Sequence, residues 1–314
     1  MAKPIFLSGM KPTGTPHIGN YFGALKQWVD LQDKGEYDCF CMVADYHALN
    51  FVQDAKQMQE LTIELTRTLL AIGLDPRKVT IFKQSDVPSH TELAWVFDTI
   101  TTMPYLERAH AYKDAEAKSK EISVGTFNYP MLMAADILLY DAAVVPVGQD
   151  QKQHIEYARD TAEKFNRIYG ETFTLPKEYI MPEVAIVPGT DGQKMSKSYG
   201  NTIPLFASRE EIEKAVMSIV TDSSGERPEN VYAIHKLVKN EKELMPLYET
   251  NKGKYKVLKE ALIEDLDAFI APMRARYLKT SPAQVKRILE KGGKVARKRA
   301  DTKMGQVRKA IGVA

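Results

Sequence analysis

The sequence predicts an α/β fold, a doubly wound parallel sheet followed by an all-helical region. Three observations favour this fold class. Short apolar runs alternate with helical patterns through the first half of the chain, in strand–helix–strand–helix order. One run, residues 38–45, is apolar almost throughout, as expected of a strand covered on both faces. After residue 201 the strand signals stop and only helical periodicity continues.

The first half of the chain contains three expected strands with helices between them. The strands are residues 4–9, 38–45 and 79–85. A Gly- and Pro-rich turn follows the first strand, and apolar residues then recur at helical spacing from Ile18 to Val29. Asp54 is a candidate N-cap for the next helix. Ser89 and Glu92 have the spacing of a capping box, which predicts the start of a third helix.

The remainder of the predicted sheet follows an interruption. The charged segment 112–123 breaks the pattern, and we expect it to be a mobile insertion. Beyond it we expect an apolar helix, a short strand, a further helix and a last strand, at residues 129–140, 144–148, 151–169 and 184–187. Ser208 and Glu211 form another capping box, which opens the helical region.

The bulk composition is that of a globular protein. The chain has 314 residues, of which 44% are hydrophobic and 27% charged, enough for a substantial core and more than one domain. No apolar run approaches the roughly 18 residues of a membrane span, and the N-terminus has no secretory signal pattern, so we expect a cytoplasmic protein without membrane contact. Cys39 and Cys41 are the only cysteines, too few for a disulfide framework or a zinc cluster.

The C-terminal end of the chain is basic although the net charge is only +2. Glu290 and Asp301 alone oppose ten cations there. These cations are Lys286, Arg287, Lys291, Lys294, Arg297, Lys298, Arg299, Lys303, Arg308 and Lys309. Such a block is typical of a solvated helix face, and it can also contact the phosphate backbone of a nucleic acid.

The segment PTGTPHIGN, residues 12–20, lies between the first strand and the first helix, where open α/β sheets bind ligands. Gly14 and Gly19 permit close backbone approach, and the helix N-terminus offers free N–H groups to a phosphate. Asn20 stands where a P-loop requires Lys, which excludes that motif. The glycines alone fit an ordinary turn, but His17 can donate to a phosphate without carrying a fixed charge, which favours a phosphate site.

Asp136 lies inside the apolar pattern MLMAADILLY, with Tyr129, Met133 and Tyr140 on the same helix face. An ionised carboxylate in such surroundings needs a partner, and no Lys or Arg stands within one turn. The partner is either elsewhere in the chain, such as a backbone N–H or a distant Arg, or a ligand. A pocket of Met and Tyr around one acceptor suits a large aromatic group with one N–H.

Two further segments carry polar side chains suited to a nucleotide. In VGQDQKQH, residues 147–154, a Gly, an Asp and a Gln stand at a strand-to-helix junction, although the same residues fit an ordinary helix start. In GTDGQKMSKSYGN, residues 189–201, Lys194 and Lys197 can each bring an ammonium to a triphosphate. This Gly-flanked segment reads as a mobile loop that closes over ATP and opens again, and its alternative is a solvated surface turn.

The motifs PHIGN, residues 16–20, and KMSKS, residues 194–198, resemble the two signatures of class I aminoacyl-tRNA synthetases. YPMLMAADILLY, VPVGQDQKQH and GTDGQKMSKSYGN further resemble the bacterial-type tryptophanyl-tRNA synthetases, and the similarity runs from residue 5 to the C-terminus. The resemblance implies a Rossmann catalytic domain at 1–201 with a connective insertion at about 88–140 and the KMSKS loop at 189–201. It implies a helical anticodon-binding domain at 202–314.

The resemblance also implies an activity. Tryptophan reacts with ATP to give tryptophanyl-adenylate and pyrophosphate, and tryptophan is then transferred to its tRNA. The implied partners are L-tryptophan, ATP with substrate-borne Mg²⁺, the tRNA and a second copy of the chain in a homodimer. Because no Cys follows Cys41, the iron–sulfur cluster of some relatives is not expected, and neither is zinc.

The family's site residues carry over onto positions of this sequence that match its motifs. The implied catalytic residues are His17, Asn20, Lys194 and Lys197. The implied ATP-binding residues are Lys11, Thr13, Gly14, His17, Gly19, Asn20, Gly148, Asp150, Lys194, Met195, Lys197 and Ser198. The implied tryptophan-binding residues are Leu7, Gly9, His47, Tyr129, Met133, Asp136, Val145, Val147 and Gln151.

Among these, the resemblance makes Asp136 the acceptor of the indole N–H, Tyr129 and Gln151 the partners of the α-ammonium, and Met195 a neighbour of adenine. Lys11, Gln149 and the segment ADYHA depart from the usual family residues, which bears on the edge of the pocket.

Three alternatives remain. A tyrosyl-tRNA synthetase shares both signatures, but a phenol donates and accepts whereas an indole N–H only donates, which suits a lone carboxylate. A nucleotidyltransferase of the same superfamily is usually shorter and lacks the basic helical region. A non-charging paralogue with an RNA-binding role is disfavoured because His17, Asn20, Lys194 and Lys197 are all present.

Overall fold

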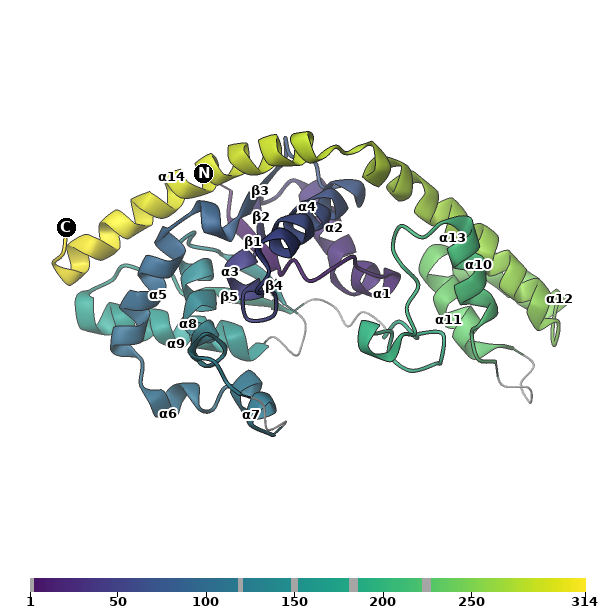
Figure 1. Cartoon of the computed structure of the whole chain (residues 1–314), viewed down its shortest axis with the longest axis horizontal. Helices are drawn as coiled ribbons and strands as arrows, with labels where there is room; N and C mark the ends of the chain where they lie inside the picture. Colours follow the sequence, from purple (N-terminus) through teal and green to yellow (C-terminus); the bar gives the residue numbers. More distant parts are fainter. Residues whose placement is uncertain (1–2, 118–120, 148–151, 181–185, 222–226) are drawn as a thin grey trace.

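The structure is a computed structural model of the chain, and it describes residues 3–117, 121–147, 152–180, 186–221 and 227–314. At its centre is a parallel sheet in the order β3-β2-β1-β4-β5 (Figure 1). The strands are β1 (Ile5–Met10), β2 (Asp38–Val43), β3 (Val79–Lys83), β4 (Val144–Val147) and β5 (Lys177–Ile180). The predicted α/β class with a doubly wound parallel sheet is confirmed.

The strand order reverses at β1, because β2 and β3 lie on one side of it and β4 and β5 on the other. In open α/β sheets such a reversal opens a crevice at the carboxyl ends of the strands. β1 pairs with β2 along its whole length, whereas its register with β4 joins Phe6 to Val144 only. The two central strands therefore separate toward the end at which the Gly-rich turn begins.

The helices between and after the strands follow the predicted order. They are α1 (Ile18–Asn20), the π-helical turn η1 (Tyr21–Leu25), α2 (Lys26–Lys34), α3 (Asp45–Ala48), α4 (Ala55–Ala71), the 3-10 turn η2 (Gln84–Asp86), α5 (Ser89–Ile100), α6 (Met103–Leu106), α7 (His110–Ala117), α8 (Val124–Leu138) and α9 (Lys152–Tyr169). The predicted cap of α4 is confirmed, since Asp54 Oδ1 accepts from the N–H of Gln57 at 2.7 Å. α8 begins earlier than predicted, because Ser123 caps it by accepting from the N–H of Thr126.

The charged segment 112–123 is helical in part, since α7 extends through Ala117, and its mobility stays a prediction. The position of the last strand needs correction. The last strand is β5, not residues 184–187, of which 184 and 185 lie outside the described residues. Ile186 and Val187 are not in a strand. The carbonyl of Val187 accepts instead from the N–H of Met195 at 2.9 Å, so its backbone pairs with the KMSKS segment rather than with the sheet.

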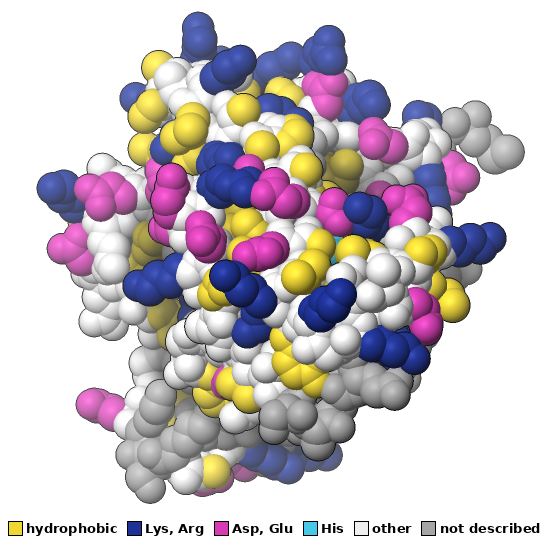
Figure 2. All heavy atoms as spheres, turned by 90° about the vertical axis from the view of Figure 1, so that its right-hand side faces the viewer, with side chains coloured by type: hydrophobic (Ala, Val, Ile, Leu, Met, Phe, Trp, Pro, Cys, Tyr) yellow, Lys and Arg dark blue, Asp and Glu magenta, His cyan; other side chains and the backbone are white. Residues whose placement is uncertain are grey.

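The second half of the chain is helical, as predicted. After the 3-10 turn η4 (Lys197–Tyr199) come α10 (Arg209–Met217), α11 (Glu229–Val238), α12 (Glu241–Thr250), α13 (Tyr255–Lys279) and α14 (Pro282–Ile311). The capping box of α10 is confirmed, with Ser208 and Glu211 bonding reciprocally. Figure 1 shows α10–α13 as a body beside the α/β part, with α14 running back across the sheet edge. Figure 2, which faces the helical end, shows acidic and basic side chains interspersed over it.

Helix α14 lies against the α/β part rather than projecting into solvent. Its Gly292 is buried, and a Cβ atom there would lie 1.9 Å from the carbonyl oxygen of Ile81 in β3. Four cations of the basic block bond to the α/β part. Arg297 donates to the carbonyl of Asp86, Arg299 to that of Tyr140, Lys303 to that of Thr172, and Arg308 to the Glu92 carboxylate. These four of the ten cations are therefore structural.

The contact with α14 also explains why the predicted capping box at Ser89 and Glu92 is wrong. The N-cap of α5 is Pro88, and no side chain caps the helix. Ser89 Oγ donates instead to Asp301 at 3.0 Å, and Glu92 is held by Arg308 at 2.7 Å. Both side chains have the right spacing for a cap, but partners on a helix more than 200 residues away compete for them.

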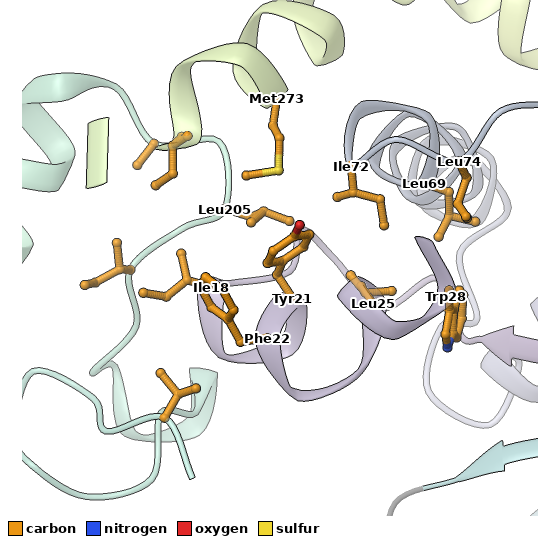
Figure 3. Packing of buried hydrophobic residues seen from close by; sticks show 14 of the residues in the cluster. Ile18, Tyr21, Phe22, Leu25, Trp28, Leu69, Ile72, Leu74, Leu205 and Met273 are labelled. Atoms are coloured by element: carbon orange, nitrogen blue, oxygen red, sulfur yellow. The ribbon is translucent and has the colours of Figure 1, made fainter. Parts of the chain in front are cut away.

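One hydrophobic cluster joins the first helix to the helical region. Ile18, Tyr21 and Phe22 pack with Leu205 and Met273 (Figure 3). The stacked rings of Phe22 and Phe269, with centroids 5.4 Å apart, strengthen the same contact. The predicted domain boundary between residues 201 and 202 stays a prediction, and the helical region shares core with the α/β part across it.

Candidate functional site

Two glycines shape the turn that follows β1. Gly14 has φ +110°, in the left-handed region that favours glycine, and a Cβ atom there would lie 3.2 Å from Nζ of Lys197. A Cβ atom on Gly19 would lie 2.9 Å from Nδ1 of His17. Lys197 thus reaches the turn from a segment that is remote in the sequence.

His17 stands at the first helical turn with only 7% of its surface exposed. Its backbone N–H donates to Oδ1 of Asn20 at 3.1 Å, whereas its buried Nδ1 has no hydrogen-bond partner among the described residues. Burial and the nearby ammonium of Lys197 lower the pKa of His17 to about 4. The imidazole is therefore neutral at pH 7 and can donate one hydrogen bond without adding charge.

The two motifs PHIGN and KMSKS meet through the chain that follows the second motif. The N–H of Ile18 donates to the carbonyl of Ile203 at 3.0 Å, and the N–H of Leu205 donates to the carbonyl of Pro16 at 3.1 Å. These bonds flank an antiparallel bridge between His17 and Pro204. The structure therefore brings together the halves of the site that the sequence separates.

The KMSKS segment forms a hydrogen-bonded turn, and its closing and opening over ATP stays a prediction. Asn201 is 2% exposed and lies at its centre. Oδ1 of Asn201 accepts from the N–H of Ser196 at 2.8 Å, and its Nδ2 donates to Asp191 at 2.7 Å and to the carbonyl of Lys194 at 3.2 Å. A Cβ atom on Gly189 would lie 2.3 Å from Asn201, so glycine is needed there for packing.

Several predicted ATP-binding residues line the turn. Burial lowers the pKa of both Lys197 and Lys11, and Nζ of Lys11 lies 4.6 Å from the ring centroid of Phe51. Thr13, Lys194 and Ser198 are exposed at the surface. The ammonium groups and the neutral imidazole leave this turn electropositive, as an anionic triphosphate requires.

Met195 lies in the core and not in the open site. It is 4% exposed and belongs to the hydrophobic cluster beneath the turn, and its Cβ lies 3.3 Å from the place of a Cβ on Gly19. Met195 therefore supports the turn from below, and its contact with adenine stays a prediction.

Asp136 is the centre of a buried polar cluster. Its Oδ2 lies 2.9 Å from Nε2 of His47, its Oδ1 lies 2.6 Å from Nδ1 of His90, and Nε2 of Gln84 donates to both oxygens. Burial alone would raise the pKa of Asp136, but the attraction of His90 and the hydrogen bonds from both histidines outweigh it and lower the pKa. Asp136 is therefore an ionised carboxylate held in place by three side chains.

Sequence reasoning missed His90 and Gln84. It sought a cation or a backbone N–H as the partner of Asp136, and the partners are two imidazoles and one amide. The signal that could have found them is the polar run that follows β3, because residues at the carboxyl end of a parallel strand face the ligand edge of the sheet.

Two predicted tryptophan-binding residues lie beside Asp136 on the side of His47. The rings of His47 and Tyr129 are in edge contact, with centroids 6.2 Å apart, and the Tyr129 hydroxyl lies 3.0 Å from Nε2 of His154. Leu7 and Val145 are buried, and Met133 is half-buried against the same hydrophobic cluster. That these residues form one aromatic slot stays a prediction.

Gly9 lies near the end of β1, where a Cβ atom would lie 3.2 Å from the terminal methyl of Met42. The backbone of Val147 ends β4. Gly148, Asp150 and Gln151 lie outside the described residues, and their proposed roles stay predictions.

Within the described residues, no group of three or more His, Cys, Asp and Glu side chains could hold a metal ion. None of the helices in the described ranges is long and apolar enough to cross a membrane.

A family model described as tRNA synthetases of class I (W and Y) matches residues 1–281. The chain belongs to this family. A tryptophan–tRNA ligase from Fusobacterium nucleatum is 46% identical over 98% of this chain and 97% of its own length. A tryptophanyl-tRNA synthetase from Campylobacter jejuni, solved in complex with ADP and tryptophan, superposes with a TM-score of 0.91 at 44% identity and covers 98% of this chain and 99% of its own.

The class I synthetase fold extends to a more distant relative. A tyrosyl-tRNA synthetase from Archaeoglobus fulgidus, complexed with L-tyrosine, has a TM-score of 0.68 at 22% identity and covers 88% of this chain and 90% of its own. At that identity the likeness shows a shared fold and carries no statement about substrate.

Proposed function

We propose that this chain is a tryptophan–tRNA ligase that activates L-tryptophan with ATP and transfers it to tRNA in the cytoplasm. The observation that carries the proposal is the meeting of PHIGN and KMSKS in one electropositive turn at the switch point of the sheet. The buried ionised carboxylate of Asp136 supports it. The full-length identity with tryptophan–tRNA ligases favours tryptophan over tyrosine as the amino acid.

The turn after β1 supplies the ATP half of the proposed site. His17 and Asn20 contact phosphate oxygens, and Gly14 and Gly19 let the backbone approach them. Lys11, Thr13 and Ser198 border this region, while Gly148 and Asp150 hold the ribose. Mg²⁺ bound to the triphosphate would neutralise part of its charge.

In the first step an oxygen of the tryptophan carboxylate attacks the α-phosphorus of ATP, and the bond to the bridging oxygen of pyrophosphate breaks. The leaving pyrophosphate gains negative charge, which the ammonium groups of Lys194 and Lys197 stabilise. A ribose hydroxyl of the tRNA then attacks the carbonyl carbon of the mixed anhydride, and AMP leaves. The protein contributes positioning and charge rather than a covalent intermediate.

The slot beside Asp136 supplies the tryptophan half. Asp136 accepts the indole N–H, and His47, Leu7, Gly9, Met133, Val145 and Val147 surround the ring. The α-ammonium is assigned to Tyr129 and Gln151. Because a carboxylate only accepts, the slot favours a ring that donates one hydrogen bond.

Four exposed cations of the basic block support a contact with the tRNA backbone. Arg287, Lys291, Lys294 and Lys298 recur at helical spacing on the exposed face of α14, and none of them forms an ion pair among the described residues. A groove of about 340 Å³ beside this stripe is lined by Arg77, Arg287 and Lys291. Unpaired cations next to a groove suit a phosphate backbone.

The proposal includes a homodimer. Large apolar side chains stand exposed in two successive helices, Trp95 in α5 at 70% and Met103 in α6 at 61%, and a second copy of the chain can cover them. Sedimentation equilibrium of the purified protein tests this, and a monomer at micromolar concentration would contradict it.

Amino-acid-dependent pyrophosphate exchange tests the activity. Exchange is expected with tryptophan and should be lower by several orders of magnitude with tyrosine and phenylalanine. Charging of tRNA should follow in the same preparation. Exchange with tyrosine instead would assign the chain to the tyrosyl branch, and failure with every amino acid would revive the non-charging alternative.

A further inference from the structure

The polar cluster around Asp136 has two sides. On one side His47 lies against Tyr129 in the proposed slot. On the other side His90 is fully buried, its ring is stacked on Phe82 with centroids 6.3 Å apart, and its Nε2 lies 2.9 Å from the hydroxyl of Tyr140. Asp136 therefore stands between the slot and the core.

The orientation of Gln84 is fixed by its backbone partners. Its Oε1 accepts from the N–H groups of Tyr46 at 3.1 Å and His47 at 3.4 Å, so the amide cannot be flipped without losing both bonds. Nε2 must then point to Asp136, where it lies 2.8 Å from Oδ1 and 3.0 Å from Oδ2. Gln84 is fully buried and thus aligns the plane of the carboxylate.

The proton on Nδ1 of His90 is fixed in the same way. Because an ionised carboxylate only accepts, Nδ1 of His90 must carry the proton that faces Asp136. Nε2 of His90 lies 2.9 Å from the hydroxyl of Tyr140, which is buried and whose pKa burial raises. Tyr140, His90 and Asp136 therefore form a hydrogen-bonded chain that ends on Oδ1.

This arrangement leaves Oδ2 as the oxygen on the slot side. Oδ1 takes the short bond from His90 and the shorter of the two Gln84 contacts. Oδ2 is bonded to His47 and makes the longer contact with Nε2 of Gln84, a donor that both oxygens share. A carboxylate has about four lone-pair sites, so Oδ2 retains capacity for one further donor.

We propose that His90 and Gln84 are positioning residues for amino-acid selection, which orient Asp136 and keep it ionised so that Oδ2 accepts an indole N–H. The inference rests on the proposed function, in which Asp136 contacts the indole. Without these donors, a buried carboxylate rotates or takes up a proton, and a protonated carboxyl group no longer selects a donor.

The experiment compares tryptophan with β-(3-benzothienyl)alanine, which carries sulfur in place of the indole N–H, in pyrophosphate exchange. His90→Leu and Gln84→Leu should each raise KM for tryptophan by roughly 10- to 100-fold, the range for one hydrogen bond to a buried charge. The KM for ATP should change less than about threefold. The preference for tryptophan over the sulfur analogue should fall by the same factor as KM rises.

His90→Asn provides the rescue variant. The Asn amide can donate as Nδ1 does but cannot reach Tyr140, so it should restore most of the preference for tryptophan if the donor to Asp136 is what matters. Equal behaviour of His90→Asn and His90→Leu would overturn the positioning role of His90, and Gln84→Leu keeps the test open if His90→Leu does not fold.

The chain contains a matched control outside the site. His235 is fully buried in α11 and bonds to Asp265 at 2.8 Å and to the Tyr248 hydroxyl at 3.1 Å, the same Asp–His–Tyr chemistry as around His90. His235→Leu should lower stability yet leave the preference for tryptophan unchanged. If it lowers the preference as much as His90→Leu does, the effect is general destabilisation and the inference is wrong.

Asp136→Ala, which removes the acceptor, separates this inference from the proposed function. If Asp136→Ala leaves the preference for tryptophan intact, Asp136 is not the indole acceptor and both statements fail. If Asp136→Ala abolishes the preference while His90→Leu and Gln84→Leu retain it, the proposed function stands and the positioning role alone is refuted.

Discussion

Replacing Gly292 by alanine places a methyl carbon 1.9 Å from the carbonyl oxygen of Ile81. A carbon–oxygen contact closes to no less than about 3.3 Å, so α14 would have to retreat from β3 by about 1.4 Å. The obstacle is sheet backbone, which cannot turn aside as a side chain can. Forcing extra volume into a packed interface costs typically about 1–3 kcal/mol, and the upper end applies here.

Alanine also gains about 1 kcal/mol of helix propensity over glycine, so Gly292→Ala should lose a net of about 2 kcal/mol of the free energy of unfolding. Gly305 in the same helix is the control, because a Cβ atom there meets nothing within 4 Å. Gly305→Ala should therefore gain up to about 1 kcal/mol.

Urea denaturation followed by circular dichroism gives the two free energies, and hydrogen exchange reports whether the amides of α14 and β3 lose protection together in Gly292→Ala. The bond from Arg297 to the carbonyl of Asp86 lies one to two turns further along α14 and should weaken with the same displacement. If Gly292→Ala proves as stable as Gly305→Ala, α14 does not approach β3 this closely. The structural role of the four cations that bond to the α/β part would then be wrong as well.

Three further predictions concern the site and its surface. Lys197→Ala should lower kcat for adenylate formation by about 100-fold or more while tryptophan KM changes little, because its ammonium meets charge that develops only as pyrophosphate leaves; stopped-flow kinetics measure this, and equal losses in both would make the turn merely structural. The pKa of His17 is lowered from 6.5 to about 4, so its contribution to the free energy of unfolding is complete above pH 6.5 and is lost as pH falls toward 4. This contribution is on the order of 2 kcal/mol after discounting for partial solvent access. His17→Gln should reduce the dependence of the free energy of unfolding on pH, which denaturation at several pH values measures. Replacing Arg287 and Lys291 by Glu should raise the KM for tRNA by roughly 10-fold at low salt and leave pyrophosphate exchange unchanged. The control is Lys256→Glu, at a side chain 3.9 Å from Glu260, which should not raise the KM for tRNA. An unchanged KM for tRNA in the first variant would mean that the exposed cations of α14 only form a solvated helix face.

Local features could be predicted where the hydrogen-bonding partners are close neighbours in the sequence. Asp54 and Ser208 cap their helices because the N–H groups they accept from lie within three residues. The first three strands could be predicted from apolar runs, because a strand that is buried on both faces is recognised from its own residues without knowledge of remote contacts. Ser89 and Glu92 have the same local spacing, and there the prediction was wrong because Asp301 and Arg308 compete for them.

In the candidate site too, some residues could be predicted from the sequence and others could not. PHIGN, KMSKS and Asp136 could be found in the sequence because each is unusual in its own neighbourhood: glycines at a strand end, two cations in a turn, a charge in an apolar helix. Which groups face them could not be found, because those groups lie far along the chain. Lys197 approaches Gly14 across more than 180 residues, and His47, Gln84 and His90 reach Asp136 from α3, η2 and α5.

The sequence by itself determined the fold class, the order of the elements and the family, because these depend on periodicity and on short motifs that are read along the chain. Only the tertiary structure decided that four cations of the basic block bond to the α/β part, that the KMSKS segment is hydrogen-bonded around Asn201, and that Asp136 has three buried partners. The physical reason is that hydrogen bonds and desolvation depend on which groups folding brings within about 3 Å, and no local pattern specifies that distance.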